Sequence, residues 1–219
     1  MADPDWIGPP VEQAYWSLDG GSVYYQIKQK GSPVRDLHRV ELASGRDSVV
    51  DPNAMAEADG ATPVYDRERK RAAFVRNGDV FVRELPSARL QQITRTPQQE
   101  ASPQFSADGR AVQYRVGSDW FVHDLAGHVS GPAAVVKTAK DPDAKKADDL
   151  GVMQLRWFST LRKIKSDRDA QKKNADDYAQ GDPTRAPLPF YIGDDVQVEG
   201  SALSPNGRWL LLVTSPKGH

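Results

Sequence analysis

The sequence contains no cysteine. Disulfide bonds, thiolate nucleophiles and metal sites with cysteine ligands are therefore excluded as sources of stability or chemistry. The absence leaves the redox compartment open, because chains without disulfides occur in oxidising and reducing compartments alike.

The sequence also lacks an excess of charge and a long apolar run. Lysine and arginine number 29 against 30 for aspartate and glutamate, a formal net charge of −1 at pH 7. A balance this even gives no global field to attract nucleic acid or an anionic membrane, and no apolar run approaches the ~20 residues that span a bilayer. We therefore expect neither nucleic acid nor a membrane as a partner.

A third absence concerns hydrolytic chemistry. The sequence has no Gly-x-Ser-x-Gly, the turn that exposes a hydrolase serine between a strand and a helix. The nearest approach is Gly127–Gly131, where the serine stands one place late, and we interpret it as a hairpin connection. The histidines, at His38, His123, His128 and His219, show no HExxH or other close ligand pair, so we predict no metal site and no cofactor.

What the sequence does contain is one phrase used three times. An apolar residue, a serine and an Asp-Gly or Asn-Gly turn recur at Trp16–Gly21, Phe105–Arg110 and Leu203–Arg208, each followed by another apolar stretch. A tight turn between strands that repeats along a chain is typical of a repeated sheet unit. The intervals from the first phrase to Tyr65, and from Tyr65 to the second phrase, are each roughly 40 to 50 residues, the length of a propeller blade.

Strand signals fill these units. Asn77-Gly78, a strong hairpin turn, lies between two runs rich in β-branched and aromatic residues. The strands predicted in the three units are Ser22–Ile27, Leu37–Leu42, Ala72–Arg76, Val80–Leu85, Leu90–Thr94, Ala111–Val116 and Trp120–Leu125. Four short strands per unit predict an all-β fold, an incomplete β-propeller with WD40-like or TolB-like blades.

A segment of different character separates the second phrase from the third. Over residues 137–190 the two-residue period stops, and lysine, aspartate and alanine crowd together. Apolar residues at every third position from Val152 to Ile164 predict a helix over residues 148–165. From Ser166 to Gln180 the weaker pattern leaves open a longer helix, a second helix or a mobile stretch, which Gly181–Pro183 ends.

The chain therefore divides into three predicted parts. Residues 1–136 are propeller blades, residues 137–190 are a helical insertion, and residues 191–219 are the start of a next, truncated blade. Because the sequence stops at Ser215–His219, half way through a repeat, we expect it to be a fragment. The segment Met1–Trp6 has neither the basic nor the apolar region of a signal peptide.

The repeated phrase, with the strand, glycine turn and Asp/Glu-Leu ending that follow it, resembles the propeller repeats shared by TolB-like proteins and the S9 (prolyl oligopeptidase) family of serine peptidases. A more specific likeness lies in Asp182–Tyr191 followed by Leu203–Trp209. That combination looks like the N-terminal region of bacterial S9 peptidases that have a helical excursion between blades. The resemblance covers most of the chain, but only the non-catalytic part of the family.

This resemblance implies a function. Family members carry a C-terminal α/β-hydrolase domain with a Ser, Asp, His triad, and the propeller caps that site and restricts entry to short or unfolded peptides. The chain would then gate and dock peptide substrates for a catalytic domain absent from it, with no catalytic residue of its own and with substrate-binding residues unassigned. It would be periplasmic or secreted, with the cytoplasm as the alternative.

The acidic pairs bear on specificity. The exopeptidase branch of the family holds a substrate's amino terminus with a pair of glutamates, and no two glutamates are adjacent in this sequence. Its neighbouring acids are aspartates: Asp148-Asp149, Asp176-Asp177 and Asp194-Asp195. Without the spacing of a Ca²⁺ loop, we interpret them as helix caps or solvated surface.

Two alternatives to the peptidase hypothesis remain. One is a non-enzymatic TolB-like propeller that binds protein partners. The other is a repeat module that forms homo-oligomers, because a partial propeller leaves sheet edges and blade faces unpaired. Trp157 and Phe158, adjacent and bulky on the predicted helix, point in different directions, so one of them could face a partner or the missing catalytic domain while core packing of both is the alternative.

Overall fold

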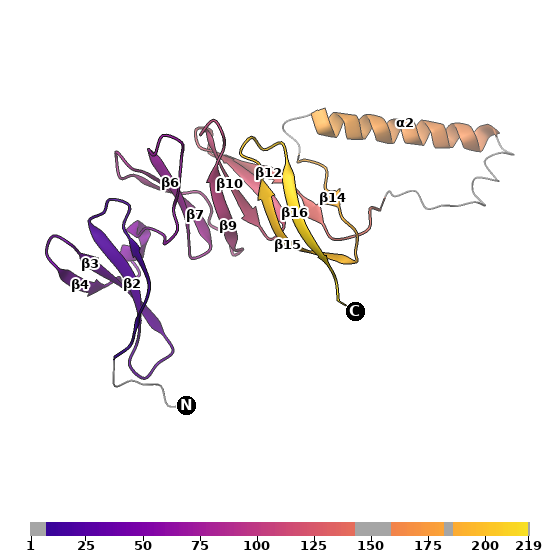
Figure 1. Cartoon of the computed structure of the whole chain (residues 1–219). Coiled ribbons are helices and arrows are strands. Elements are labelled where there is room, and N and C mark those ends of the chain that lie inside the picture. The colour runs from indigo at the N-terminus through magenta and orange to yellow at the C-terminus, as the bar shows by residue number, and fades with distance from the viewer. Residues whose placement is uncertain (1–7, 143–158, 182–185, 219) are drawn as a thin grey trace. The chain divides into compact units, whose positions relative to one another are not determined.

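The computed structural model describes residues 8–142, 159–181 and 186–218. They belong to two compact units, Met1–Gly117 with His123–His128 and Ser118–Val122 with Val129–His219. Within the described residues, three four-stranded sheets follow one another, and in each the strands are neighbours in chain order (Figure 1). Such successive four-stranded antiparallel meanders are propeller blades. The prediction of an all-β fold, an incomplete β-propeller, is confirmed.

The seven strands predicted in the blades are found to within a few residues at their ends. The first sheet comprises β1 (Val11–Trp16), β2 (Ser22–Lys28), β3 (Arg35–Glu41) and β4 (Arg46–Val49). After the short 3-10 helix η2 (Ala54–Glu57), the second sheet comprises β5 (Val64–Tyr65), β6 (Arg71–Arg76), β7 (Asp79–Glu84) and β8 (Leu90–Gln92). The third comprises β9 (Glu100–Phe105), β10 (Ala111–Val116), β11 (Asp119–Asp124) and β12 (Val129–Ala134). The other five blade strands, β1, β4, β5, β9 and β12, were not predicted.

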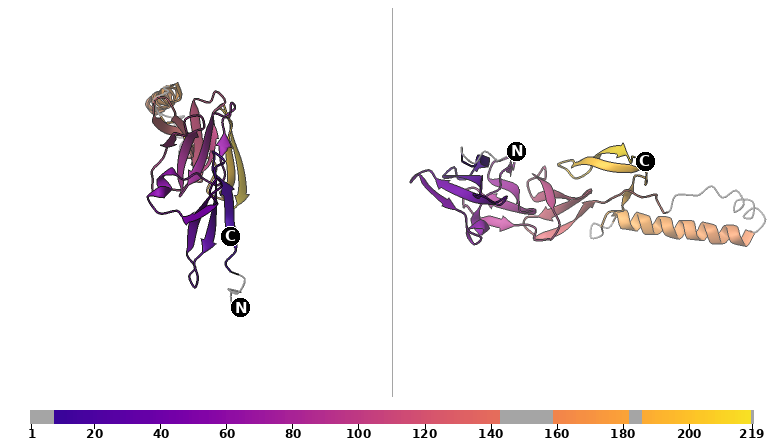
Figure 2. Two further views of the ribbon diagram at one scale, coloured as in Figure 1. Left: turned by 90° about the vertical axis from the view of Figure 1, so that its left-hand side faces the viewer. Right: turned by 90° about the horizontal axis from the view of Figure 1, so that it is seen from below.

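The rest of the chain contains a helix and two small sheets. Strands β13 (Val136–Lys137) and β14 (Phe190–Tyr191) pair in parallel, while β15 (Val196–Leu203) and β16 (Leu210–Pro216) form an antiparallel hairpin. Helix α2 (Ser159–Gly181) is one uninterrupted helix, seen from the side in the right-hand view of Figure 2.

The insertion can be compared with its prediction only in part. Where the predicted helix overlaps the described residues, from Ser159 onward, the chain is helical, and the alternative of a longer helix is correct because α2 continues to Gly181. Residues 148–158, with Asp148-Asp149, Trp157 and Phe158, lie outside the described residues. No helix in the described part of the chain is both long and apolar enough to cross a membrane. The division into three parts, with its two boundaries, remains a prediction.

The three repeats of the phrase, and the segment Tyr65–Lys70, all fold into the same turn. In each, the carbonyl of the first turn residue accepts the N–H of the residue three positions later, and its N–H donates to the carbonyl of the residue five positions later. The first residues are Ser17, Asp66, Ser106 and Ser204. The residue three positions on is left-handed in every case, with φ of 70°, 53°, 69° and 70°. Glycine occupies this place in three turns because it adopts positive φ without steric cost, whereas the second turn has Arg69.

Side chains reinforce these turns. In the serine turns the hydroxyl accepts the backbone N–H of the residue five positions on, at 2.9 Å in each. In the second turn Asp66 takes over this role and accepts the N–H of Lys70 at 2.8 Å and of Arg71 at 3.1 Å. The segment Tyr65–Lys70, which lacks the phrase, therefore forms the same turn with different side chains.

The core is centred on the second sheet. The buried apolar side chains there come from its two central strands, which carry an unbroken apolar run on both faces: Ala72, Ala73, Phe74, Val80, Phe81 and Val82. The rings of Phe74 and Phe81 stack with centroids 5.8 Å apart. In the second compact unit, Trp120, Ala134 and Leu203 form a smaller buried cluster, with Ala133 and Leu210 packed against it.

Candidate functional site

The turns after β5 and β9 are joined by one arginine. Nε of Arg71 donates to Oδ2 of Asp66 at 3.0 Å, and Nη2 donates to the carbonyl of Gly109, in the next sheet's turn, at 2.7 Å. The guanidinium also lies over the ring of Phe105, 5.4 Å from its centroid. Arg71 thus connects the second sheet to the third through a backbone hydrogen bond and a cation–π contact, while its ion pair with Asp66 lies within the second sheet.

A second ion pair links the first sheet to the second. Nε of Arg83 donates to Oδ1 of Asp59 at 2.6 Å, and both side chains are almost entirely buried. The other carboxylate oxygen of Asp59 accepts the backbone N–H of Leu18, in the first turn, at 2.8 Å. Arg83 also donates to the carbonyls of Glu57 and Ala88. Because every partner is hydrogen-bonded, the buried charges are compensated.

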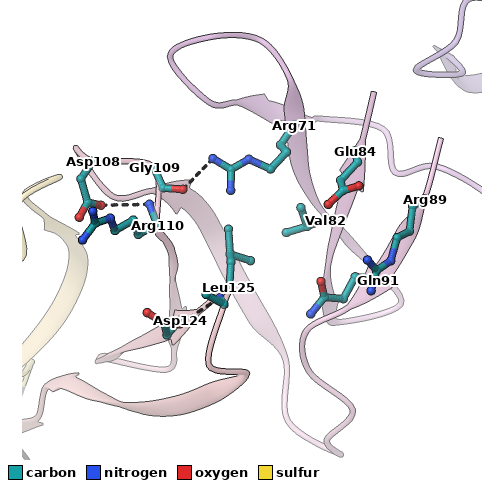
Figure 3. Close-up of a pocket in the computed structure, with 11 residues that line it drawn as sticks. Arg71, Val82, Glu84, Arg89, Gln91, Asp108, Gly109, Arg110, Asp124 and Leu125 are labelled. Carbon is teal, nitrogen blue, oxygen red and sulfur yellow. Dashed lines mark hydrogen bonds between the residues drawn. The ribbon is translucent and has the colours of Figure 1, made fainter. Parts of the chain in front are cut away.

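Beside Arg71 lies a cavity of about 580 Å³, which we call the turn-side groove. Figure 3 shows side chains from the second sheet on one side of it and the β9–β10 and β11–β12 turns on the other. Its lining is Arg71, Val82, Glu84, Arg89, Gln91, Asp108, Gly109, Arg110, Asp124, Leu125 and Ala126. The volume lies in the range of small-molecule and peptide pockets.

The charged groups of the groove differ in whether other residues of the protein already form hydrogen bonds or ion pairs with them. Asp108 accepts the hydroxyl of Ser106 and the N–H of Arg110, while Asp124 accepts the N–H of Ala126 at 2.9 Å. Within the described part of the chain, no hydrogen bond or ion pair engages the guanidinium groups of Arg89 or Arg110. The groove therefore offers two cationic groups to a ligand, beside carboxylates and the apolar side chains Val82 and Leu125.

Electrostatics keep the turn carboxylates ionised. Burial acts to raise the pKa of Asp66, but the hydrogen bonds from the backbone and side chain of Arg71 and from Lys70 outweigh it, so that this pKa lies below its ordinary value. The backbone N–H of Arg110, with the Ser106 hydroxyl, lowers the pKa of Asp108. Both groups are anionic at neutral pH.

Two histidines lie near the groove. His123, in β11, is buried, and its ring centroid lies 6.3 Å from that of His128. Burial lowers the pKa of His123, and the neighbouring His128 lowers it further, so the His123 ring is neutral at pH 7. Nδ1 of His128 lies 3.0 Å from Nε2 of Gln91, a groove residue.

The other residues considered from sequence fall elsewhere. Gly127–Gly131 spans the connection into β12, where His128 N–H donates to the carbonyl of Asp124, so the hairpin interpretation is confirmed. His38 occupies an ordinary position in β3, 3.2 Å from Oδ1 of Asp47. Asp194 pairs with Lys140 at 3.4 Å. Among the described residues, no three His, Asp or Glu side chains are grouped to hold a metal ion.

Sequence reasoning missed the residues that join the sheets. Asp66 had a usable signal, because it stands where the other turns have serine and Arg71 follows five positions later. Asp59 and Arg83 had none, since they are 24 residues apart and neither belongs to the repeated phrase.

No family model matches the chain. No curated protein matches it either. Among solved structures it is similar to TolB from Acinetobacter baumannii, with 14% identity and a TM-score of 0.30 over 57% of this chain and 32% of that one. The acylaminoacyl peptidase of Pyrococcus horikoshii is 12% identical, with a TM-score of 0.33 over 57% of this chain and 24% of that one. The β-propeller domain of the trilobed protease from Pyrococcus furiosus is 15% identical, with a TM-score of 0.31 over 53% of this chain and 41% of that one.

The chain spans less than half the length of each of these three proteins. With TM-scores this low, the likeness carries no argument, and the assignment of blades depends on the order of strands in the chain's own sheets.

Proposed function

We propose that this chain is a non-catalytic propeller segment of a serine peptidase of the S9 type, and that it docks peptide substrates for an α/β-hydrolase domain encoded outside these residues. The proposal is supported by the sequence resemblance in the repeated phrase and in Asp182–Tyr191 with Leu203–Trp209, although residues 182–185 lie outside the described residues. It fits the absence of Gly-x-Ser-x-Gly from the sequence.

The observation that carries the docking role is the composition of the turn-side groove. A peptide presents carboxylates, amide groups and apolar side chains along one strand. Arg89 and Arg110 complement the carboxylates, while Val82 and Leu125 provide apolar contact. The short, fixed turns beside the groove are anchored by Asp66 and Arg71, so binding would require little ordering of the protein.

The experiment compares the product of the complete gene with the 219-residue chain. Both are assayed on chromogenic peptides that contain Xaa-Pro or Ala-Ala, and the gene is inspected for a downstream Gly-x-Ser-x-Gly. Cleavage by the full product alone, lost on substitution of that serine, is the expected result. A full product without such a serine, or one that cleaves nothing, contradicts the peptidase proposal and leaves the TolB-like binding propeller as the function to pursue by pull-down.

Groove variants of the full product test the docking role separately. Arg89→Glu and Arg110→Glu should raise KM for peptides with acidic residues by about tenfold each and leave kcat unchanged, because they remove contacts made equally in the ground state and transition state. Arg95→Glu is the matched control, since Arg95 is exposed and lies outside the groove lining. Equal effects of all three variants would show that only bulk charge matters.

A further inference from the structure

A second cavity lies at the junction of the first and second sheets. Its volume is about 660 Å³. The β1–β2 turn and residues of β2, β3 and β4 line one side, while the connection from β4 to β5, the end of β7 and the connection after β7 line the other. We call this cavity the Tyr24 pocket, because the side chain of Tyr24 forms part of its wall. Its volume is that of a site for a small molecule.

Tyr24 brings a buried hydroxyl group to this pocket. The side chain is 6% exposed, yet within the described part of the chain no hydrogen bond engages the hydroxyl. Burial raises the pKa of Tyr24, and the charges of Arg39 and Asp59, both in the pocket wall, act on this pKa as well. The hydroxyl therefore lies among the charged groups of the pocket. Because a buried hydroxyl without a hydrogen bond is costly, a bond to a ligand would be favourable.

The neighbouring Tyr15 shows the contrast. The rings of Tyr15 and Tyr24 stack with centroids 5.2 Å apart. The hydroxyl of Tyr15 donates to the carbonyl of Asp59 at 3.0 Å, and Tyr15 is not part of the pocket wall. Two stacked tyrosines thus differ in that one hydroxyl has a partner in the protein and the other lines a cavity.

Arg39 lies next to Tyr24 and has donors to spare. The two residues are directly paired across β2 and β3, so their side chains share one face of the sheet. Nε of Arg39 donates at 2.9 Å to the hydroxyl of Ser22, which is completely buried. Among the residues that the structure describes, none forms a hydrogen bond or an ion pair with the two Nη groups of Arg39. A guanidinium held in this way can bind a carboxylate, with the Tyr24 hydroxyl as a further donor.

The other charged groups of the wall are mainly carboxylates. They are Asp19, Asp51, Glu57 and Asp59, with Arg83 as the second cation. Arg83 and Asp59 form the buried ion pair described above, so their charges compensate each other. A hydrogen bond from the Ser17 hydroxyl lowers the pKa of Asp19, which is anionic at neutral pH. Arg39 therefore faces a pocket in which three carboxylates have no cationic partner among the other lining residues.

This balance of charge discriminates between ligands. A ligand that is only anionic would meet three carboxylates around a single available guanidinium, and like charges in a cavity repel. A ligand that is only cationic would leave the donors of Arg39 and Tyr24 without a partner. A ligand with one group of each sign satisfies both sets of residues.

We propose that the Tyr24 pocket binds a small zwitterion of the class of amino acids and dipeptides. Its carboxylate accepts hydrogen bonds from the Nη groups of Arg39 and from the Tyr24 hydroxyl. Its ammonium group lies toward Asp19, Asp51 and Glu57, on the remaining wall of the pocket. The inference does not depend on the peptidase proposal, since it concerns another cavity and requires no catalytic domain.

The first experiment titrates the 219-residue chain with Ala-Ala by isothermal calorimetry at neutral pH. Two blocked dipeptides are the comparison: acetyl-Ala-Ala lacks the ammonium group, and Ala-Ala amide lacks the carboxylate. Ala-Ala should bind, and each blocked form should bind at least about tenfold more weakly, because a charged hydrogen-bonding group has been removed. Free alanine, titrated in the same way, tells whether the pocket prefers an amino acid or a dipeptide.

Variants of the pocket assign the binding to its residues. Arg39→Gln and Tyr24→Phe should each weaken Ala-Ala binding by about tenfold. Arg46→Gln is the matched control for the arginine, because Arg46 lies in β4 of the same sheet and outside the pocket wall.

The stacked tyrosines separate binding from folding. Tyr24→Phe removes a hydroxyl that no residue of the described chain engages, so the melting temperature without ligand should stay the same or rise. Tyr15→Phe removes the hydrogen bond to the carbonyl of Asp59 and should lower the melting temperature while the affinity for Ala-Ala stays unchanged.

Four results would overturn the proposal. They are a chain that binds neither Ala-Ala nor alanine, equal binding of Ala-Ala and a blocked form, and binding that Tyr24→Phe leaves unchanged. The fourth is binding that is lost in Arg110→Glu and retained in Arg39→Gln, which would assign the dipeptide to the turn-side groove.

Discussion

The first and second sheets share the same turn and the same four-strand order, but they differ in burial. At matching places in the central strands, Tyr24 of the first sheet is buried as Ala73 of the second is, but Tyr25 is partly exposed where Phe74 is completely buried. In the first sheet only one face is covered, and its other face exposes Trp16, Val11 and Val49.

This difference shows what a neighbour contributes. Local sequence determines that both segments form meanders, because the turns and β-branched runs are similar in the two. How deeply a blade's side chains are buried depends on whether apolar surface packs against both of its faces. This packing matters because the apolar area removed from water is the main contribution of a sheet to the stability of the fold. Four predictions test or sharpen this comparison.

The largest effect is expected at Phe74. Phe74→Ala removes a completely buried ring that stacks on Phe81 and should lower the free energy of unfolding by about 3–5 kcal/mol. Tyr25→Ala, at the matching place in the first sheet, should cost only about 1–2 kcal/mol because Tyr25 is partly exposed. Urea unfolding measures both, and equal costs would mean that the two sheets are equally well packed.

The buried ion pair between the sheets comes next. Asp59→Asn leaves the guanidinium of Arg83 buried without its counter-charge and should cost about 3 kcal/mol, at the low end for a broken buried pair because the amide oxygen still accepts. The control is Glu12→Gln, which breaks the exposed pair between Glu12 and Arg35 in the first sheet and should change stability much less, because solvent screens that pair. Thermal unfolding of the two variants separates the cases, and equal shifts in Tm would contradict the role given to Asp59.

Asp66 should make stability depend on pH. Its pKa is lowered in the folded state, so its stabilisation is present above the ordinary aspartate pKa and is lost as pH falls below about 4. Asp66→Asn should cost about 1–2 kcal/mol at neutral pH and progressively less in acid. Asp66→Ser removes the carboxylate but keeps a side chain that suits the turn, since serine occupies this place in the other three turns. A cost for Asp66→Asn that does not change between pH 7 and acid would show that ionisation of Asp66 is irrelevant.

The smallest effect concerns the backbone of the second turn. Arg69 has φ of 53°, where the other turns have glycine, so Arg69→Gly should stabilise by about 0.5–1 kcal/mol. The reciprocal change in the first sheet, Gly20→Arg, should cost about 1 kcal/mol, since Gly20 has φ of 70° and open space beyond it. Opposite signs in a chemical denaturation series are the expected outcome. A loss on Arg69→Gly would show that the arginine's contact with Tyr65 outweighs backbone strain.

Sequence patterns predicted seven of the twelve described blade strands, and the turns between them, because those depend on neighbours along the chain, as at Asn77-Gly78 between β6 and β7. They did not predict the groove, whose lining comes from separate strands and turns, nor the pairing of Asp59 with Arg83. Charged residues carry no periodic signal that reveals a partner distant in sequence. The length of α2 was also left open, because the apolar stripe stops at Ile164 and the remainder of the helix, to Gly181, is polar nearly throughout.

The parallel pairing of β13 with β14 has a consequence for the tolerance of the fold to change. Val136 pairs with Phe190 and Lys137 with Tyr191, and the N–H of Phe190 donates to the carbonyl of Val135 at 2.8 Å. The chain thus leaves and re-enters at adjacent points, and whatever sequence connects them contributes no strand to this pair. Cassettes of other lengths could be exchanged between Lys140 and Leu188 at an entropic cost that grows only slowly with loop length. The segment between Lys140 and Leu188 is accordingly a suitable place to insert a reporter or a binding module into the protein.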